Sequence, residues 1–238
     1  MHFGFRAGFG NIVVTGLVPV TPLGKARAGL SGMAGTSPAM TNGSIMIFLR
    51  AVILCAATAL VAGNALARPV HIVAYGDSMT AGWLVARHDA YPAQLQAALR
   101  KKGHDVVVDN AGINGATSRD ALLHFDEAIA PDTDIALIEF GTNDLRRHIP
   151  ISTVRSRVAD IVRSLRERKI EVLVIGFAGL RLGAVARAQN VGYAEWNLPP
   201  GKYRARDHAH YNAQGYAIVV ARMLPQIEGL IARVQARR

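Results

Sequence analysis

Short apolar runs alternate with amphipathic stretches along residues 68–238. Consecutive apolar residues predict buried strands, which fall at 70–75, 106–108, 135–140 and 170–177. Apolar residues spaced three and four apart predict helices, which fall at 91–102, 118–129, 152–169 and 212–234. Gly76 and Gly141 are expected to end two of the strands, and Gly103 to end the first helix. Asn212 is expected to cap the last helix, and Pro225 to kink or break it.

Strands that alternate with helices predict a parallel sheet with helices on both faces. The expected fold class is therefore α/β, with a three-layer αβα (flavodoxin-like) architecture and a sheet of four to five strands. The segment 179–206 leaves the fifth strand open, because it fits a short helix with a strand or mostly loop. Ligands in such sheets bind beyond the carboxyl ends of the strands, so functional residues are expected just after strands.

The composition excludes two classes of protein. Half of the 238 residues are hydrophobic and 18% are charged, which is too apolar for an intrinsically disordered chain. Cys55 is the single cysteine, so a scaffold held by internal disulfides is excluded. The formal net charge is +10, and it is unevenly distributed. Residues 1–67 carry four bases and no acid, whereas in residues 68–238 the bases outnumber the acids by six.

The leading segment has the build of an export signal rather than of a domain. Residues 45–63 are nearly all apolar, Arg50 is their single charge, and Ala65-Leu66-Ala67 offers small residues where a signal peptidase cleaves. We expect a signal peptide at 45–67, cleavage after Ala67, and a periplasmic or secreted domain at 68–238. An uncut membrane anchor is the alternative. Residues 1–44 have no periodic pattern and are expected to be disordered or to precede the true start of translation.

Three short polar motifs follow predicted strands. Gly76-Asp-Ser78 comes after the first strand, so the Ser78 hydroxyl is expected at the carboxyl edge of the sheet, at a helix N-terminus that favours negative charge. The alternative is that Asp77 or Ser78 only caps that helix. Asn110-Ala-Gly112 and Gly141-Thr-Asn143-Asp144 follow the next two strands, and each alone is most often a turn or cap. A Gly-x-Ser-x-Gly elbow is missing from residues 68–238, which disfavours an ordinary α/β-hydrolase.

A fourth motif, Asp207-His-Ala-His210, precedes the final helix. A spacing of three allows the Asp207 carboxylate to fold back onto one ring nitrogen of His210 and leave the other free as a base. A surface turn is one alternative. A metal site is another, because His208, His210 and Asp207 are plausible ligands.

Together the four motifs supply a nucleophile, a base, an orienting acid and oxyanion donors, as acyl transfer requires. At this point residues 68–238 resemble the SGNH (GDSL) hydrolase family, whose four blocks match these motifs in order. The resemblance implies that Ser78 is the nucleophile and His210 the base, oriented by Asp207. It implies oxyanion donors at the backbone N–H groups of Ser78 and Gly112 and at the Asn143 side chain. It implies no cofactor and no metal.

The residues Ala74-Tyr-Gly-Asp-Ser-Met-Thr-Ala-Gly82 and Tyr91-Pro-Ala-Gln-Leu95 look most like the secreted arylesterase, thioesterase and lysophospholipase branch, whose sheet has five parallel strands. The expected function is a secreted serine ester hydrolase that forms an acyl-enzyme on a small-molecule or lipid ester. Two alternatives stay open: an O-acetylesterase of cell-surface polysaccharide, and a non-catalytic binding domain. The interval 178–206 is short for this branch, which places the substrate in more doubt than the catalytic residues.

Basic residues crowd the third predicted helix and its approach, namely Arg146, Arg147, Arg155, Arg157, Arg163, Arg166, Arg168 and Lys169. No aromatic residues are interleaved with them, so we expect no nucleic-acid binding. A solvated helix face is the expected role, and weak attraction to anionic lipid headgroups is the alternative. Trp83 follows Ser78 closely and is expected either to line a substrate pocket or to join the core.

Overall fold

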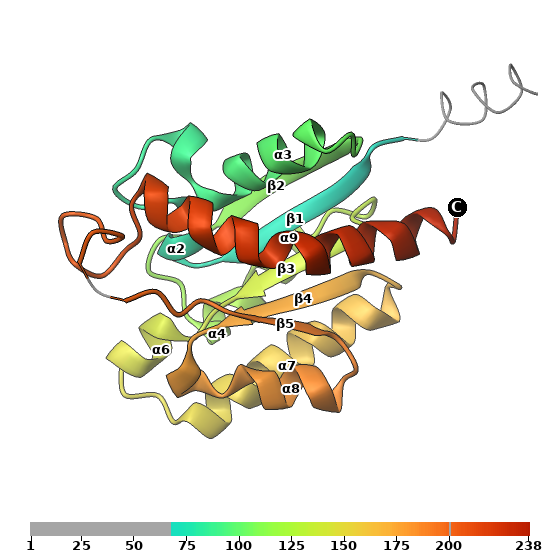
Figure 1. The fold of residues 1–238 in the computed structure, drawn as a ribbon. Coiled ribbons are helices and arrows are strands. Elements are labelled where there is room, and N and C mark those ends of the chain that lie inside the picture. Colours follow the sequence, from blue (N-terminus) through green and yellow to red (C-terminus); the bar gives the residue numbers. More distant parts are fainter. Residues whose placement is uncertain (1–67, 200) are drawn as a thin grey trace, which may run out of the picture. The chain divides into compact units, whose positions relative to one another are not determined.

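The structure, a computed structural model, describes residues 68–199 and 201–238. Five parallel strands form one sheet in the order β2-β1-β3-β4-β5 (Figure 1). Their bounds are Val70–Gly76 for β1, Val106–Gly112 for β2, Ile135–Glu139 for β3, Glu171–Gly176 for β4 and Gly192–Glu195 for β5. The predicted prefix (1–44) and signal peptide (45–67) lie outside the described residues.

Helices cover both faces of the sheet. Figure 1 shows α3 and α9 on one face and α7 and α8 on the other. The α-helices are α2 (Ser78–Ala81), α3 (Tyr91–Lys101), α4 (Ser118–Leu123), α5 (Phe125–Ala128), α6 (Thr142–Arg146), α7 (Ile151–Glu167), α8 (Leu182–Ala188) and α9 (Ala213–Gln235). Two short 3-10 helices span Arg87–Asp89 and Ala178–Leu180. Each face of the sheet packs its own apolar core against these helices, which confirms the predicted three-layer α/β class.

Two predicted elements differ in extent from the structure. The predicted strand 106–108 continues to Gly112, so Asn110 and Gly112 end β2 instead of following it. As an edge strand, β2 is paired on one side, and its residues after Val106 are exposed or half-buried. The polar half of the strand therefore lacks an apolar signal. The predicted helix 118–129 is interrupted at His124 and forms α4 and α5.

The segment 179–206, which the sequence left open, holds α8 and the fifth strand. β5 has four residues, and only Ala194 among them is fully buried. The next residue but one, Trp196, is buried in the core that faces α9. β5 thus joins the sheet by backbone pairing with β4, and its side chains give no strand pattern.

The last helix begins as predicted and runs further than predicted. Asn212 caps α9, its Oδ1 accepting from Gly215 N at 3.0 Å. Of the kink or break expected at Pro225, the break is wrong, because α9 is continuous across the proline. Met223 and Ile227, on either side of the proline, are both buried. Packing against the sheet therefore outweighs the backbone hydrogen bond that the proline cannot donate.

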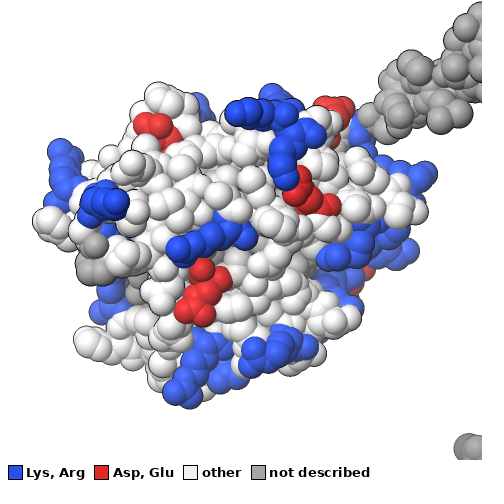
Figure 2. Space-filling view, viewed as in Figure 1, with Lys and Arg blue, Asp and Glu red and all other residues white. Residues whose placement is uncertain are grey.

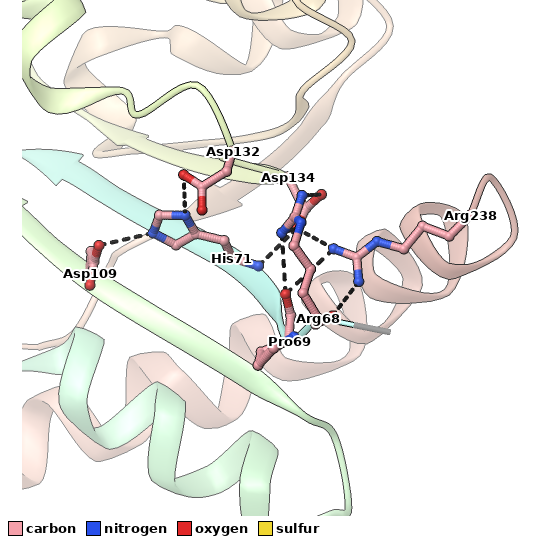
Figure 3. A network of polar contacts seen from close by, with 7 residues as sticks. All are labelled: Arg68, Pro69, His71, Asp109, Asp132, Asp134 and Arg238. Atoms are coloured by element: carbon pink, nitrogen blue, oxygen red, sulfur yellow. Dashed lines mark hydrogen bonds and ion pairs between the residues drawn. The ribbon is translucent and has the colours of Figure 1, made fainter. Parts of the chain in front are cut away.

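The first and last described residues, Arg68 and Arg238, both form ion pairs with Asp134 (Figure 3). The Arg68 guanidinium donates to both carboxylate oxygens of Asp134, at 2.7 and 2.9 Å. Arg238 donates to the same carboxylate at 2.6 Å and to the Arg68 carbonyl at 2.5 Å. The backbone N–H of His71 in β1 also donates to the Asp134 carboxylate, at 2.9 Å. The start of the described domain is thus fixed to its end at the amino edge of the sheet.

Many of the basic side chains on and near α7 have local partners. Arg163 pairs with Asp160 at 2.9 Å, Arg168 pairs with Asp126, and Arg166 donates to the Gln189 carbonyl at 2.6 Å. Figure 2 shows basic side chains spread over the face that carries α3 and α9, with acidic ones among them. None of the helices within the described residues combines the length and apolar character that a bilayer crossing needs.

Candidate active site

Ser78 lies where β1 turns into α2. Asp77 caps α2, its Oδ1 accepting from Met79 N at 2.8 Å. A Cβ on Gly76 would lie 2.0 Å from the Thr80 hydroxyl oxygen, so the tight turn requires glycine there. Ser78 is the first residue of α2, so its backbone N–H has no acceptor within the helix. Asp77 therefore caps α2, while the half-buried Ser78 lies at the carboxyl edge of the sheet.

His210 connects Ser78 to Asp207. Its Nε2 is 2.8 Å from Ser78 Oγ, and its Nδ1 is 2.5 Å from Asp207 Oδ2. The other oxygen of Asp207 accepts from the backbone N–H groups of Ala209 and His210, both at 3.1 Å. These bonds fold the carboxylate back onto the ring, as the spacing of three predicts. The structure thus brings Ser78, His210 and Asp207 into one hydrogen-bonded row.

The electrostatics of this row favour a charged Asp207. Its side chain is 31% exposed. Partial burial opposes ionisation, but the hydrogen bonds from the His210 ring and backbone outweigh it and lower the pKa of Asp207 to about 2. His210 itself is 9% exposed. An anion on one side of a largely buried imidazole stabilises the ring when it accepts a proton on the other side.

The metal-site alternative fits this geometry poorly. Both ring nitrogens of His210 are engaged, so a metal ion there would have to displace Ser78 or Asp207. His208 is exposed, and its backbone has a φ of 59°. Within residues 68–199 and 201–238, no group of three or more His, Cys, Asp or Glu side chains is placed to hold a metal ion.

Gly112 brings the end of β2 against the nucleophile turn. It lies opposite Gly76 in the sheet register. A Cβ on Gly112 would lie 2.2 Å from Ala81 N, so only glycine allows this approach. The Gly112 N–H donates to Asn110 Oδ1 at 3.0 Å in this structure. An incoming oxyanion would have to compete with that acceptor.

Asn143 connects the segment that follows β3 to the segments that follow β1 and β2. It lies in α6, which begins after Gly141 at a φ of +124°, in the region that favours glycine. Its Nδ2 donates to Asp77 Oδ2 at 3.1 Å and to the Ala116 carbonyl at 3.0 Å. Both N–H bonds are therefore engaged, and an oxyanion would have to share or replace one of them.

The neighbouring Asp144 is fully buried and anchors α6 on α4. It accepts from the Ser118 N–H at 2.8 Å and from the Ser118 hydroxyl at 2.7 Å. Arg157 on α7 lies 3.6 Å away. Asp144 thus holds the helix that carries Asn143 in position.

Glu139, the last residue of β3, was not predicted as a site residue from the sequence. Its side chain is 1% exposed, and its Oε2 accepts from the Thr80 hydroxyl at 3.1 Å and from Asp77 N at 3.3 Å. Burial raises the pKa of Glu139 well above its usual range, and the nearby Asp77 carboxyl raises it further. Burial also raises the pKa of Asp77. An acid inside the apolar run 135–140 was the available signal.

Trp83 does not belong to the core. The residue is 48% exposed, and its backbone N–H donates to the Ser78 carbonyl at 3.0 Å, just beyond α2. Trp83 therefore lies on the surface close to the nucleophile turn, and the predicted core role is wrong. The role in lining a substrate pocket stays a prediction.

The chain is similar to proteins with esterase names. It is 29% identical over 105 residues to an arylesterase of Vibrio mimicus, which covers 44% of this chain and 52% of the relative. It is 29% identical over 129 residues to the esterase TesA of Pseudomonas aeruginosa, which covers 54% of this chain and 64% of the relative. The chain thus spans less than two thirds of the length of these two relatives.

The fold is also that of a solved structure. A crystal structure of TesA superposes with a TM-score of 0.61 at 22% identity, covering 67% of this chain and 99% of that one. The model of the GDSL-like lipase/acylhydrolase family matches residues 74–213, which is more than half of the chain and includes Ser78, Asn143 and His210. The chain therefore belongs to the GDSL-like lipase/acylhydrolase family, the SGNH hydrolases.

Proposed function

We propose that this protein is a serine hydrolase of carboxylic esters that works through an acyl-enzyme on Ser78. The observation that supports this most is the row of hydrogen bonds from Ser78 Oγ through His210 to Asp207, at 2.8 and 2.5 Å, in a member of this family. The esterase names of the relatives agree with it.

In the first half of the reaction, Ser78 Oγ attacks the ester carbonyl carbon while His210 Nε2 takes its proton. The imidazolium so formed is stabilised by Asp207. The carbonyl oxygen becomes an oxyanion, which accepts from the N–H groups of Ser78 and Gly112 and from Asn143 Nδ2. The bond to the leaving group then breaks, and that group takes the proton from His210.

In the second half, water attacks the acyl carbon and His210 takes the proton of the water. Collapse of the second tetrahedral intermediate releases the acid, and Ser78 Oγ regains its proton. Because Gly112 N and Asn143 Nδ2 donate to protein acceptors in this structure, the oxyanion must compete for them. Such hydrogen bonds form fully only around substrate or the transition state.

For the substrate class we propose a small-molecule or lipid ester, with thioesters included. The arylesterase and TesA names of the relatives support this choice. Trp83 and the 39% exposed Leu145 add apolar surface in segments that directly follow Ser78 and Asn143. A polysaccharide O-acetylesterase would instead release acetate from a polar carbohydrate.

A substrate panel with the purified protein tests this proposal. It contains p-nitrophenyl acetate, butyrate and octanoate, an acyl-CoA and an acetylated xylan. We expect turnover of the aryl esters that Ser78→Ala abolishes. Release of acetate from the glycan at a higher kcat/KM than from the aryl acetate would favour the O-acetylesterase. Binding of an ester without any turnover would favour a non-catalytic domain.

We further propose that the domain is exported, because a small-x-small cleavage sequence follows the apolar residues 45–63. Its surface attraction to anionic lipid is proposed to be weak, because many bases near α7 pair with local acids. Cosedimentation with phosphatidylglycerol vesicles tests the second point. Retention on the vesicles in physiological salt, where a weak attraction is screened, would contradict it.

A further inference from the structure

Two buried carboxyl groups lie together beneath the nucleophile turn. Glu139 ends β3 opposite Gly76, so its side chain reaches the residue that follows, Asp77. Both carboxyl groups belong to residues that are 1% exposed. Among the described residues, no Lys, Arg or His lies within ion-pair distance of either group. The proposed mechanism gives neither group a role in proton transfer.

Two such carboxyl groups cannot both be ionised at neutral pH, because burial and like charge each disfavour the second anion. Asp77 has the better donors, namely Met79 N at 2.8 Å and Asn143 Nδ2 at 3.1 Å. Glu139 has the Thr80 hydroxyl at 3.1 Å and a long bond at 3.3 Å from Asp77 N, which is shared with the Glu139 carbonyl. The proton therefore belongs on Glu139.

The burial of Glu139 and the negative charge of Asp77 raise the pKa of Glu139 well above the usual range, which agrees with this placement of the proton. Glu139 and Asp77 also act on the hydroxyl groups of Tyr91 on α3 and Tyr216 on α9, which are neutral because burial raises the pKa of both. His210 and Arg146 act on Asp77 from further away.

We propose that Glu139 is a positioning residue: as an uncharged acid it donates to Asp77 and accepts from Thr80, and it thereby fixes Asp77 where it holds both the start of α2 and the amide of Asn143. This inference rests on the proposed function, because it concerns the placement of Ser78 and of an oxyanion donor. It also limits the site to one buried anion near the place where the oxyanion forms.

The first test is Glu139→Gln beside Glu139→Ala, measured on p-nitrophenyl acetate. Glutamine has a donor and an acceptor where the neutral acid has them, so kcat should stay within about 3-fold of wild type. Alanine removes both, and kcat should fall about 10- to 100-fold with little change in KM, on the scale of a small misplacement of catalytic groups. A Glu139→Gln variant as inactive as Glu139→Ala, or an active Glu139→Ala, would overturn the proposal.

The second test does not depend on esterase activity or on the folding of Glu139→Ala. A buried acid with a raised pKa stabilises the fold fully below its unfolded pKa and loses that contribution as pH rises toward its folded pKa. The Tm of Glu139→Gln minus that of wild type should therefore increase between pH 5 and pH 8. The matched control is Glu195→Gln at the exposed end of β5, which should give a constant difference. A constant difference for Glu139→Gln as well would overturn the proposal even if the esterase activity is present.

Discussion

Ser78 and His210 are 132 positions apart in the chain, yet the hydroxyl of one lies 2.8 Å from the imidazole of the other. Ser78 follows the carboxyl end of β1, and His210 precedes α9, which packs across the same sheet. The carboxyl ends of parallel strands share one edge of the sheet. The segment 196–212, which connects β5 to α9, brings His210 to this edge.

The Asp207–His210 hydrogen bond predicts that His210, and not His208, is the base. Asp207→Asn should lower kcat strongly, up to about 10⁴-fold, because an amide favours the wrong tautomer of the ring. His208→Ala should change kcat little, since its neighbour His210 has both contacts. Initial rates on an aryl ester compare the three variants His208→Ala, His210→Ala and Asp207→Asn. An inactive His208→Ala together with an active His210→Ala would show that the base is assigned wrongly.

The same hydrogen bond makes the stability of the fold depend on pH in the acidic range. The pKa of Asp207 is lowered to about 2 in the folded protein, so its contribution is present above the ordinary aspartate range and is lost as pH falls toward 2. The difference in Tm between wild type and Asp207→Asn should therefore be full at pH 6, shrink below about pH 4 and largely vanish only at about pH 2. A difference in Tm that stays the same down to that pH would contradict the assignment.

Asn143 should affect turnover more than substrate binding. Asn143→Ala removes one proposed oxyanion donor and should lower kcat about 10²- to 10³-fold. KM should change much less, because the donor acts on charge that develops during the reaction. Asn197→Ala is the matched control, since Asn197 is exposed and lies after β5. Equal kcat values for the two variants would remove Asn143 from the catalytic account.

Glycine 112 should tolerate no side chain. Gly112→Ala places a Cβ 2.2 Å from Ala81 N and should cost about 1–3 kcal/mol of stability or more. Gly229→Ala in α9 meets nothing within 4 Å and should stabilise the fold by about 0.5–1 kcal/mol. Chemical denaturation measures both. If Gly112→Ala is as stable as wild type, β2 does not approach α2 as closely as described.

The cleavage sequence Ala65-Leu66-Ala67 predicts a mature N-terminus at Arg68. Arg68 is also the residue whose guanidinium holds Asp134 at 2.7 and 2.9 Å, so cleavage there would leave this contact intact. Mass spectrometry of the protein from its native host measures the terminus. A terminus upstream of Met40, with residues 45–63 retained, would contradict the proposed export.

Side-chain patterns predicted the parts of the fold that are buried on both faces. β1, β3 and β4 are nearly continuous apolar runs, and α7 buries one side chain per turn, which makes each of them visible in the sequence. β5 was left open because only Ala194 in it is fully buried, and pairing with β4 leaves no trace in side-chain spacing.

The candidate site was predicted by the order of its motifs rather than by local pattern. Ser78, Asp207 and His210 were proposed because their residue types suit one reaction. Glu139 was not found, because its contact with Asp77 depends on the register of β1 and β3, where Gly76 faces Glu139. Of the kink or break expected at Pro225, the break does not occur, because helix propensity alone does not include the packing of Met223 and Ile227.

The central claim is that Ser78 is the nucleophile, and covalent labelling tests it most directly. A p-nitrophenyl alkylphosphonate should add one phosphonyl group to the wild-type protein, and peptide mapping should place it on Ser78. Ser78→Ala should take up no label and should lose turnover by several orders of magnitude, about 10³-fold or more. Ser152→Ala, an exposed serine on α7, should be labelled like wild type. Labelling of another residue, or full esterase activity in Ser78→Ala, would contradict the account.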